Sequence, residues 1–209
     1  MRPLSQLSFS GILLIASYCS FTLVSWLAYP YPFSPLTNYL SRLGNFEYSP
    51  LGAYAYNIGC VVTGVLLLFF FADLQSLSLR TRAQRVLLAA GQLIGLCSAV
   101  ALMMIGVFSE DQGAPHMLAS SVFFELNFAV LLIVGLSCAA ERGLLRYAGL
   151  YSIFVALSSV VLALSVGGPV IEWYTVFASL LFVAQVSYIV FRSAHSRPAP
   201  MIETAFPDK

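Results

Sequence analysis

Residues 51–72 read LGAYAYNIGCVVTGVLLLFFFA, an apolar run in which no side chain is charged. At about 1.5 Å per residue, a helix of this length crosses the roughly 30 Å hydrocarbon core of a bilayer. Hydrocarbon offers the backbone no hydrogen-bonding partner, so such a run is predicted to be an α-helix, which bonds internally. The following stretch, DLQSLSLRTRAQR at 73–85, is polar and contains three arginines, which is typical of a loop at one membrane surface.

Apolar runs of similar length recur along the whole chain. Of its 209 residues, 59% are apolar and 9% are charged, whereas soluble domains contain about 25% charged residues. The predicted spans are 9–29, 51–72, 86–108, 117–140, 147–166 and 173–191. We therefore predict an all-α fold, a polytopic membrane bundle of six transmembrane helices. It forms a single domain, residues 1–192, and a flexible, proline-containing tail follows at 193–209.

Basic residues are confined almost entirely to one side of these predicted spans. Nine of the ten lysines and arginines fall on that side, and Arg42 falls on the other. The nine are Arg2, Arg80, Arg82, Arg85, Arg142, Arg146, Arg192, Arg197 and Lys209. Because cytoplasmic loops carry an excess of arginine and lysine, the rich side and both termini are predicted to be cytoplasmic. The formal net charge of +1 gives no indication of a nucleic-acid partner.

The first connection on the opposite, outer side is unusually aromatic for a solvated linker. Within it, the segment 34–44 reads SPLTNYLSRLG. Ser34 followed by a proline is a typical helix start and Gly44 a typical stop, so a short amphipathic turn or helix is expected. Its apolar face would contain Leu36, Tyr39, Leu40 and Leu43. One interpretation is an aromatic belt that anchors the loop at the interface; the other is a lid over a site between the helices.

The second outer connection is short and acidic, FSEDQGAPH at 108–116. Glu110, Asp111 and His116 can converge there, and an imidazole beside carboxylates can perform general acid–base chemistry or bind a metal. The alternative is that the acids satisfy helix ends and that His116 only opens the next span. One histidine and two acids do not define a metal site, so no metal is predicted and the cofactor is unknown.

Glu125 is predicted to lie well inside the hydrocarbon, about 12 Å below the outer end of its span. An ionisable residue at that depth costs roughly 2.5 kcal/mol or more and marks a functional candidate. We expect it to face the bundle and to have a polar partner, with Ser121, Asn57 or Gln92 as candidates. The alternative is that a protonated Glu125 only holds helices together.

Several short sequence motifs are spread over most of the chain. They are SPLTNYLSRLG at 34–44, Asn57 and Gly64 in the second span, GVFSED at 106–111, His116, and Phe123 with Phe124. From about residue 10 to 192, they resemble domain-of-unknown-function family 998, six-helix prokaryotic membrane proteins distantly similar to the eukaryotic FRAG/DRAM/SFK group. The resemblance implies a multi-pass protein of the prokaryotic plasma membrane, without an established activity. Some members of the eukaryotic group act in lipid or lipid-anchor remodelling, which favours a lipid-related function.

Two classes of function are consistent with these features. The first is a lipid-handling protein or an intramembrane enzyme with an outward-facing polar site, which requires that the two outer connections meet. Its candidate catalytic residues are Ser41, Glu110, Asp111 and His116, and its candidate ligand-binding residues are Arg42, Asn57 and Glu125. Arg42 would hold a lipid phosphate.

The alternative is a small transporter, a channel or a non-catalytic assembly component, in which Glu125 and Asn57 line a polar path. In either class, membrane lipids are the expected partners. Association with a second copy of the chain or with another membrane protein stays open.

Overall fold

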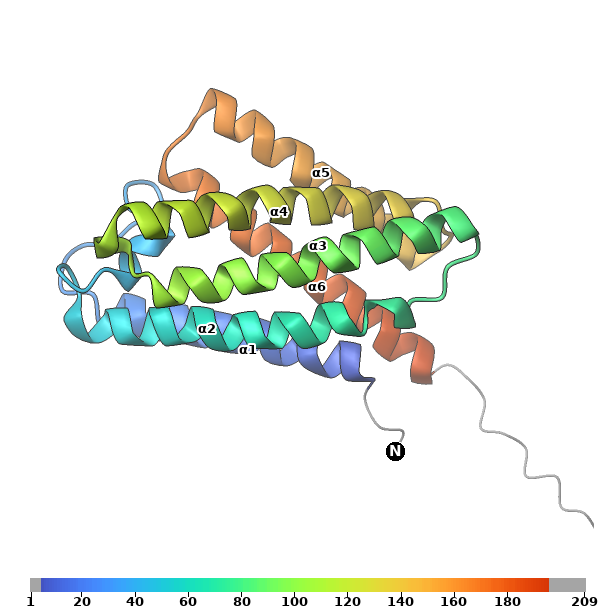
Figure 1. Cartoon of the computed structure of the whole chain (residues 1–209), viewed down its shortest axis with the longest axis horizontal. Coiled ribbons are helices and arrows are strands. Elements are labelled where there is room, and N and C mark those ends of the chain that lie inside the picture. Colours follow the sequence, from blue (N-terminus) through green and yellow to red (C-terminus); the bar gives the residue numbers. More distant parts are fainter. Residues whose placement is uncertain (1–4, 196–209) are drawn as a thin grey trace, which may run out of the picture.

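The computed structural model describes residues 5–195, and this part of the chain is all-helical (Figure 1). Its long helices are α1 (Gln6–Leu27), α2 (Pro50–Ala72), α3 (Arg82–Val107), α4 (Ala114–Ala139), α5 (Leu144–Ser165) and α6 (Pro169–His195). All six are long and apolar enough to cross a membrane, so the predicted six-helix membrane bundle is confirmed. Short 3₁₀ helices lie in the connections: η1 (Leu40–Gly44), η2 (Leu74–Ser76) and η3 (Glu110–Gln112).

The last helix is longer than its predicted span. Helix α6 continues to His195 and so includes the first residues of the segment predicted to be a flexible tail. The rest of that segment, 196–209, lies outside the described residues, and its predicted flexibility stays a prediction.

The helix ends follow from local chemistry. Before α1, the side chain of Ser5 accepts a hydrogen bond from the N–H of Ser8. At the start of α3, Thr81 and Gln84 form a capping box, in which each side chain accepts from the other residue's backbone N–H. Before α4, Gly113 has a φ of 69°, a conformation that a residue with a Cβ would adopt only under strain. These local signals explain why the helices begin within a few residues of the predicted spans.

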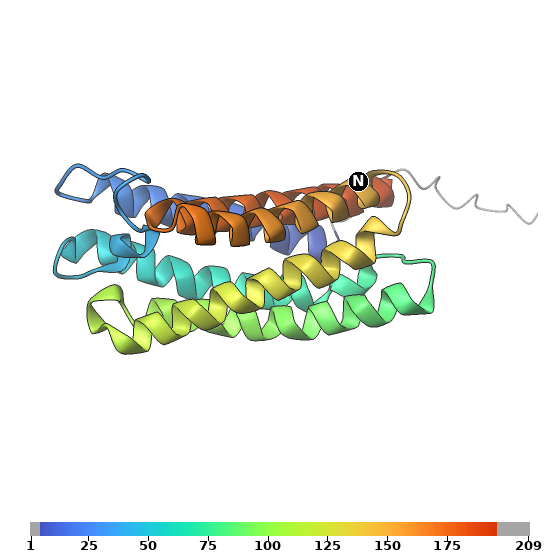
Figure 2. The ribbon, with the colours of Figure 1, turned by 90° about the horizontal axis from the view of Figure 1, so that it is seen from above.

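The helices pack in sequence order and close into a ring. Each helix packs on the next from α1 to α6, and α6 returns to pack on α1 (Figures 1 and 2). Because the connections are short, neighbours in sequence are neighbours in space. We call one end of the bundle the η2 end. It carries η2, the turn at 140–143, the start of α1 and the end of α6. The opposite end, which carries η1 and η3, is the η1 end.

Basic side chains gather at the η2 end. Of the arginines in the described part of the chain, only Arg42 lies at the η1 end. Those at the η2 end are Arg80, Arg82, Arg85, Arg142, Arg146 and Arg192. The charge asymmetry seen in the sequence is therefore an asymmetry between the two ends of one bundle.

Helices α4 and α5 approach each other closely at a pair of glycines. A Cβ placed on Gly149 would lie 2.3 Å from the backbone nitrogen of Ala139 and 2.6 Å from the carbonyl oxygen of Gly135. Both of these are backbone atoms, so the movement of a side chain could not relieve the contact. Small residues allow this close approach of two membrane helices.

We expect Gly149→Ala to force α4 and α5 apart and to lower the free energy of unfolding by about 1–3 kcal/mol, the usual cost of overpacking. Thermal unfolding in detergent, followed by circular dichroism, measures the change. Leu150→Ala, at the exposed neighbouring position, is the control and should alter stability little. Equal unfolding temperatures for Gly149→Ala and the wild type would contradict this packing.

Candidate functional site

The η1 segment is fastened to the bundle by side chains from the helices beneath it. From α1, the hydroxyl of Ser25 donates a hydrogen bond to the carbonyl oxygen of Leu43 at 3.0 Å. From α2, the side-chain amide of Asn57 donates to the carbonyl oxygen of Gly44 at 2.9 Å. Both side chains are buried, and both carbonyls lie at the C-terminal end of η1, where carbonyl groups have no partner within the helix. Asn57, a predicted ligand-binding residue, therefore positions η1.

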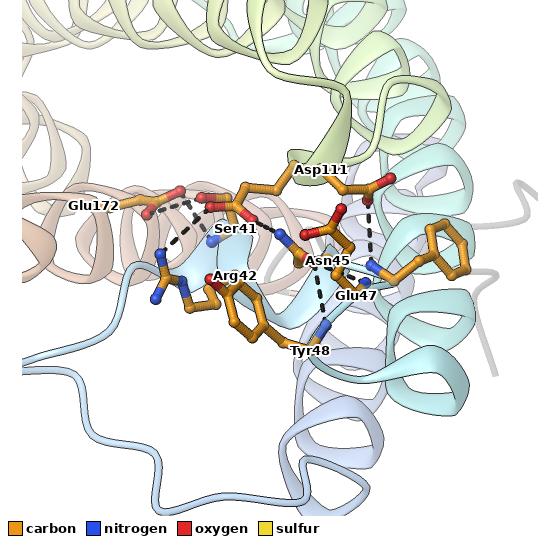
Figure 3. Close-up of polar contacts among 9 residues, drawn as sticks. Ser41, Arg42, Asn45, Glu47, Tyr48, Asp111 and Glu172 are labelled. Carbon is orange, nitrogen blue, oxygen red and sulfur yellow. Dashed lines mark hydrogen bonds and ion pairs between the residues drawn. The ribbon is translucent and has the colours of Figure 1, made fainter.

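Helix α6 holds the same segment through two successive residues. The carboxylate of Glu172 accepts hydrogen bonds from the backbone N–H of Ser41 at 3.2 Å and from its hydroxyl at 3.5 Å (Figure 3). The indole N–H of Trp173 donates to the carbonyl oxygen of Asn38 at 3.0 Å. Ser41 itself is buried, so its hydroxyl faces Glu172 and not the solvent.

A third set of contacts joins η1 to the second connection at this end. The guanidinium of Arg42 lies 3.8 Å from the carboxylate of Glu110, which also accepts a hydrogen bond from the side-chain amide of Asn45 (Figure 3). The same guanidinium stacks 4.8 Å above the ring of Tyr48. The predicted meeting of the two outer connections is thus seen for Glu110 and Arg42.

Asp111 adds a second link between the same two connections. Its carboxylate accepts a hydrogen bond from the backbone N–H of Phe46 at 3.2 Å (Figure 3). Partial burial acts to raise the pKa of Asp111, but the bonds from Phe46 and from the Ser109 hydroxyl outweigh it and lower the pKa below its usual value. Because the folded-state pKa is lowered, the stability from this link is present above the usual pKa and is lost as the pH falls through the lowered one.

His116 is engaged within its own helical hairpin. Its Nδ1 lies 2.7 Å from the carbonyl oxygen of Phe108, and its Nε2 lies 3.2 Å from the hydroxyl of Ser120. A carbonyl oxygen can only accept, so Nδ1 carries a proton; in the neutral ring, Nε2 accepts from Ser120. The ring is buried, and Ser41 is bonded to Glu172 instead. The alternative interpretation, in which His116 secures the start of α4, therefore describes its contacts better than a role beside Ser41.

Glu125 does not face the interior of the bundle, so that expectation was wrong. It is exposed and lines a cavity of about 350 Å³ between α4, α5 and α6, where α5 leans away from α4 toward the η1 end (Figure 1). The buried face of α4 includes Phe123, and a residue two positions further is turned about 200° from it. Two of the three expected partners are engaged elsewhere, since Asn57 donates to Gly44 and Gln92 donates to Ala72 at the η2 end. A ligand-binding role for Glu125 stays a prediction.

The predicted amphipathic turn or short helix at 34–44 is only partly correct. Its second half forms η1, which ends at Gly44 as predicted, and Leu40 and Leu43 are fully buried. Its first half is a turn in which Leu36 and Tyr39 are exposed, so the four residues do not share one buried face. The tighter 3₁₀ geometry and the contacts with α1, α2 and α6 override the periodicity of an α-helix.

Glu172 is the central residue of this cluster that the sequence did not indicate. It directly precedes the predicted span 173–191 and so counted as part of a short loop. In the structure it belongs to the first turn of α6. A usable signal was present, because an acidic residue in the first turn of an apolar helix is placed to bind the N–H groups of a neighbouring segment.

The fold and this cluster define a multi-pass helical membrane protein that is closed at one end by a polar cap. Residues 12–195 match the model of a family described as protein of unknown function (DUF998). The chain belongs to this family, which confirms the resemblance drawn from the short motifs. A search of the curated proteins and a search of the solved structures each gave no significant match. Among residues 5–195, no group of three or more histidine, cysteine, aspartate or glutamate side chains is placed to hold a metal ion.

We expect Asn57→Leu to leave the buried carbonyl of Gly44 without a donor and to lower the free energy of unfolding by about 1–3 kcal/mol. Chemical unfolding in detergent micelles measures this change. Gln112→Leu is the matched control, since it makes the same kind of substitution at an exposed position of η3 at the same end of the bundle. If both variants unfold like the wild type, Asn57 does not hold η1 in place.

Proposed function

We propose that this protein lies in the prokaryotic plasma membrane with its η2 end in the cytoplasm and binds a polar phospholipid headgroup at its η1 end. The orientation is supported by the arginines, which concentrate at the η2 end. The class of ligand is supported by charges of both signs that lie side by side at the η1 end (Figure 3).

The observation that carries the proposal is the incomplete pairing of Arg42. Its ion pair with Glu110 is long, at 3.8 Å, and both side chains are partly exposed, at 35% and 22%. Its Nε atom is buried and has no acceptor among the described residues. A guanidinium binds phosphate through two parallel hydrogen bonds, which this side chain could form by releasing Glu110.

The released carboxylate determines which headgroup fits best. Once a phosphate pairs with Arg42, Glu110 is left next to it with its negative charge and its bond from Asn45. An ammonium group would pair with that carboxylate. A headgroup that carries both a phosphate and an ammonium, such as phosphoethanolamine, therefore complements the Arg42–Glu110 pair without leaving a charge unpaired.

Aromatic side chains support a position of this cluster at the depth of lipid headgroups. Trp26, Phe33 and Trp173 form mutual ring contacts with centroids 5.4–6.1 Å apart, and Tyr29 extends the group by a contact of 4.8 Å with Phe33. Tryptophan and tyrosine are enriched at the interface between membrane and water. The aromatic group and the polar cap thus lie together at the η1 end.

The geometry favours binding over catalysis or passage. The hydroxyl of Ser41 contacts a carboxylate, while His116 has its partners within its own hairpin, so these residues do not form a nucleophile–base pair. The cavity inside the ring, lined by Tyr18, Thr63 and Asn127 among others, has a volume of about 70 Å³. Small-molecule sites measure about 300–1,000 Å³.

We expect Arg42→Gln to weaken the binding of short-chain phosphatidylethanolamine in detergent micelles by about tenfold or more, because charge-assisted bonds to phosphate are lost. Native mass spectrometry of the purified protein measures the bound fraction. Arg82→Gln removes the same charge from an exposed position at the η2 end and serves as control. Unchanged binding by Arg42→Gln would refute this ligand site.

The proposed orientation is tested separately with introduced cysteines. Thr37 and Ala83 are exposed at the η1 and η2 ends, respectively. A membrane-impermeant maleimide should label Thr37→Cys in intact cells and Ala83→Cys only after permeabilisation, with the wild type as control for its four native cysteines. The reverse pattern would invert the topology.

A further inference from the structure

A large cavity opens at the η2 end, opposite the polar cap. It has a volume of about 580 Å³ and lies between the start of α1, the η2 connection, the α4–α5 turn and the end of α6. This volume lies within the range of about 300–1,000 Å³ that is typical of small-molecule sites. Arg142 and Arg192 line it from two different elements, and Ser76 and Ser78 line it from a third.

The acidic residue of this cavity is already neutralised. Glu141 is buried and forms an ion pair with the Nε of Arg80 at 3.5 Å. Its carboxylate also accepts hydrogen bonds from the backbone N–H of Arg80 at 2.8 Å and from the side-chain amide of Gln84 at 3.0 Å. Three contacts therefore bind Glu141 to Arg80 and Gln84, whereas Arg142 forms no hydrogen bond or ion pair with any residue in 5–195.

Arg142 therefore contributes to the cavity a positive charge that no residue among 5–195 neutralises. Arginine binds phosphate oxygens through its planar set of donors, and hydroxyl groups such as those of Ser76 and Ser78 add neutral donors. This differs from the η1 end, where the guanidinium of Arg42 faces a carboxylate. The η2 cavity therefore suits a group with net negative charge, and not a zwitterion.

An apolar groove continues from this cavity along the seam between α5 and α6. A second cavity, of about 350 Å³, shares Leu144 and Ile189 with the first and is lined further along by Ala148, Tyr151 and Gln185. From Leu144 to Tyr151, α5 advances by about 10 Å, which is two turns into the apolar part of the helix. A positive cavity at the membrane surface is thus continuous with an apolar groove that runs toward the membrane interior.

We infer that this is a binding site for an anionic phospholipid, with the phosphate at Arg142 and Arg192 and one acyl chain in the α5–α6 groove. Basic pockets between membrane helices recognise anionic headgroups through the same chemistry. The other source of this chemistry is free phosphate, which would use the arginines but not the groove. The inference is independent of the ligand proposed for the η1 end.

The test compares retention of phosphatidylglycerol by the full-length protein in detergent micelles, measured by native mass spectrometry. Arg142→Gln/Arg192→Gln should reduce retention by about tenfold or more. Arg82→Gln/Arg146→Gln removes the same charge from exposed positions of the same end that do not line the cavity, and should retain the lipid. Circular dichroism establishes that both double variants keep their helices.

A groove variant separates the two sources of phosphate. Gln185→Trp places a large side chain on the groove wall away from the arginines, and should also reduce phosphatidylglycerol retention. If Gln185→Trp retains the lipid and millimolar inorganic phosphate displaces it, the cavity is a phosphate site and the lipid assignment is wrong. Equal retention by the Arg142→Gln/Arg192→Gln variant and the wild type would overturn the site altogether.

Discussion

The structure depends first on the fact that hydrocarbon cannot form hydrogen bonds with peptide groups. Within the membrane this leaves only helices, and it moves every irregular stretch of backbone to the two ends of the ring. At the η1 end the chain folds back over the bundle, and the inward-facing carbonyls of Leu43 and Gly44 require donors. Ser25 and Asn57, from the adjacent turns of α1 and α2, supply them. Polar residues near the ends of these helices thus serve first to close the bundle.

The carboxylates at both ends follow one pattern. Four of them accept a hydrogen bond from the backbone N–H of a segment distant in sequence, and the four pairs are Asp73 with Leu7, Asp111 with Phe46, Glu141 with Arg80, and Glu172 with Ser41. Free N–H groups occur at helix starts and in turns, and the oxygens of a carboxyl group are strong acceptors for them. These acids therefore hold loops to helices. Arg142, by contrast, forms no hydrogen bond or ion pair with any residue among 5–195, which leaves it able to meet a ligand.

The sequence was sufficient for the spans and the family, because helix length and hydropathy are properties of single segments. The sequence was less informative about which way each side chain points. Glu125 was expected inside the bundle from its depth alone, but depth does not say which face of α4 is buried. His116 was grouped with Ser41 because both belong to the same end of the bundle. In the structure, the imidazole instead contacts the carbonyl oxygen of Phe108, eight residues earlier in the chain. Glu172 and Glu141 were missed because their partners lie more than 60 residues away, and one sequence contains no measure of such pairings.

The difference between the two ends follows from how these acids are used. At the η2 end, Glu141 is engaged by Arg80 and Gln84, so Arg142 keeps its full charge. At the η1 end, the acid nearest Arg42 is Glu110, which is partly exposed and held by a long ion pair. A partly exposed ion pair is weak in water, so its arginine can exchange the carboxylate for another anion. An arginine without an ion pair, such as Arg142, can bind an anion without giving up a partner. One end therefore complements a ligand with two opposite charges and the other a ligand with a single negative charge. A bilayer supplies both kinds of headgroup, so the two proposed sites would select different lipids at the two ends of the ring without any change in the helices between them.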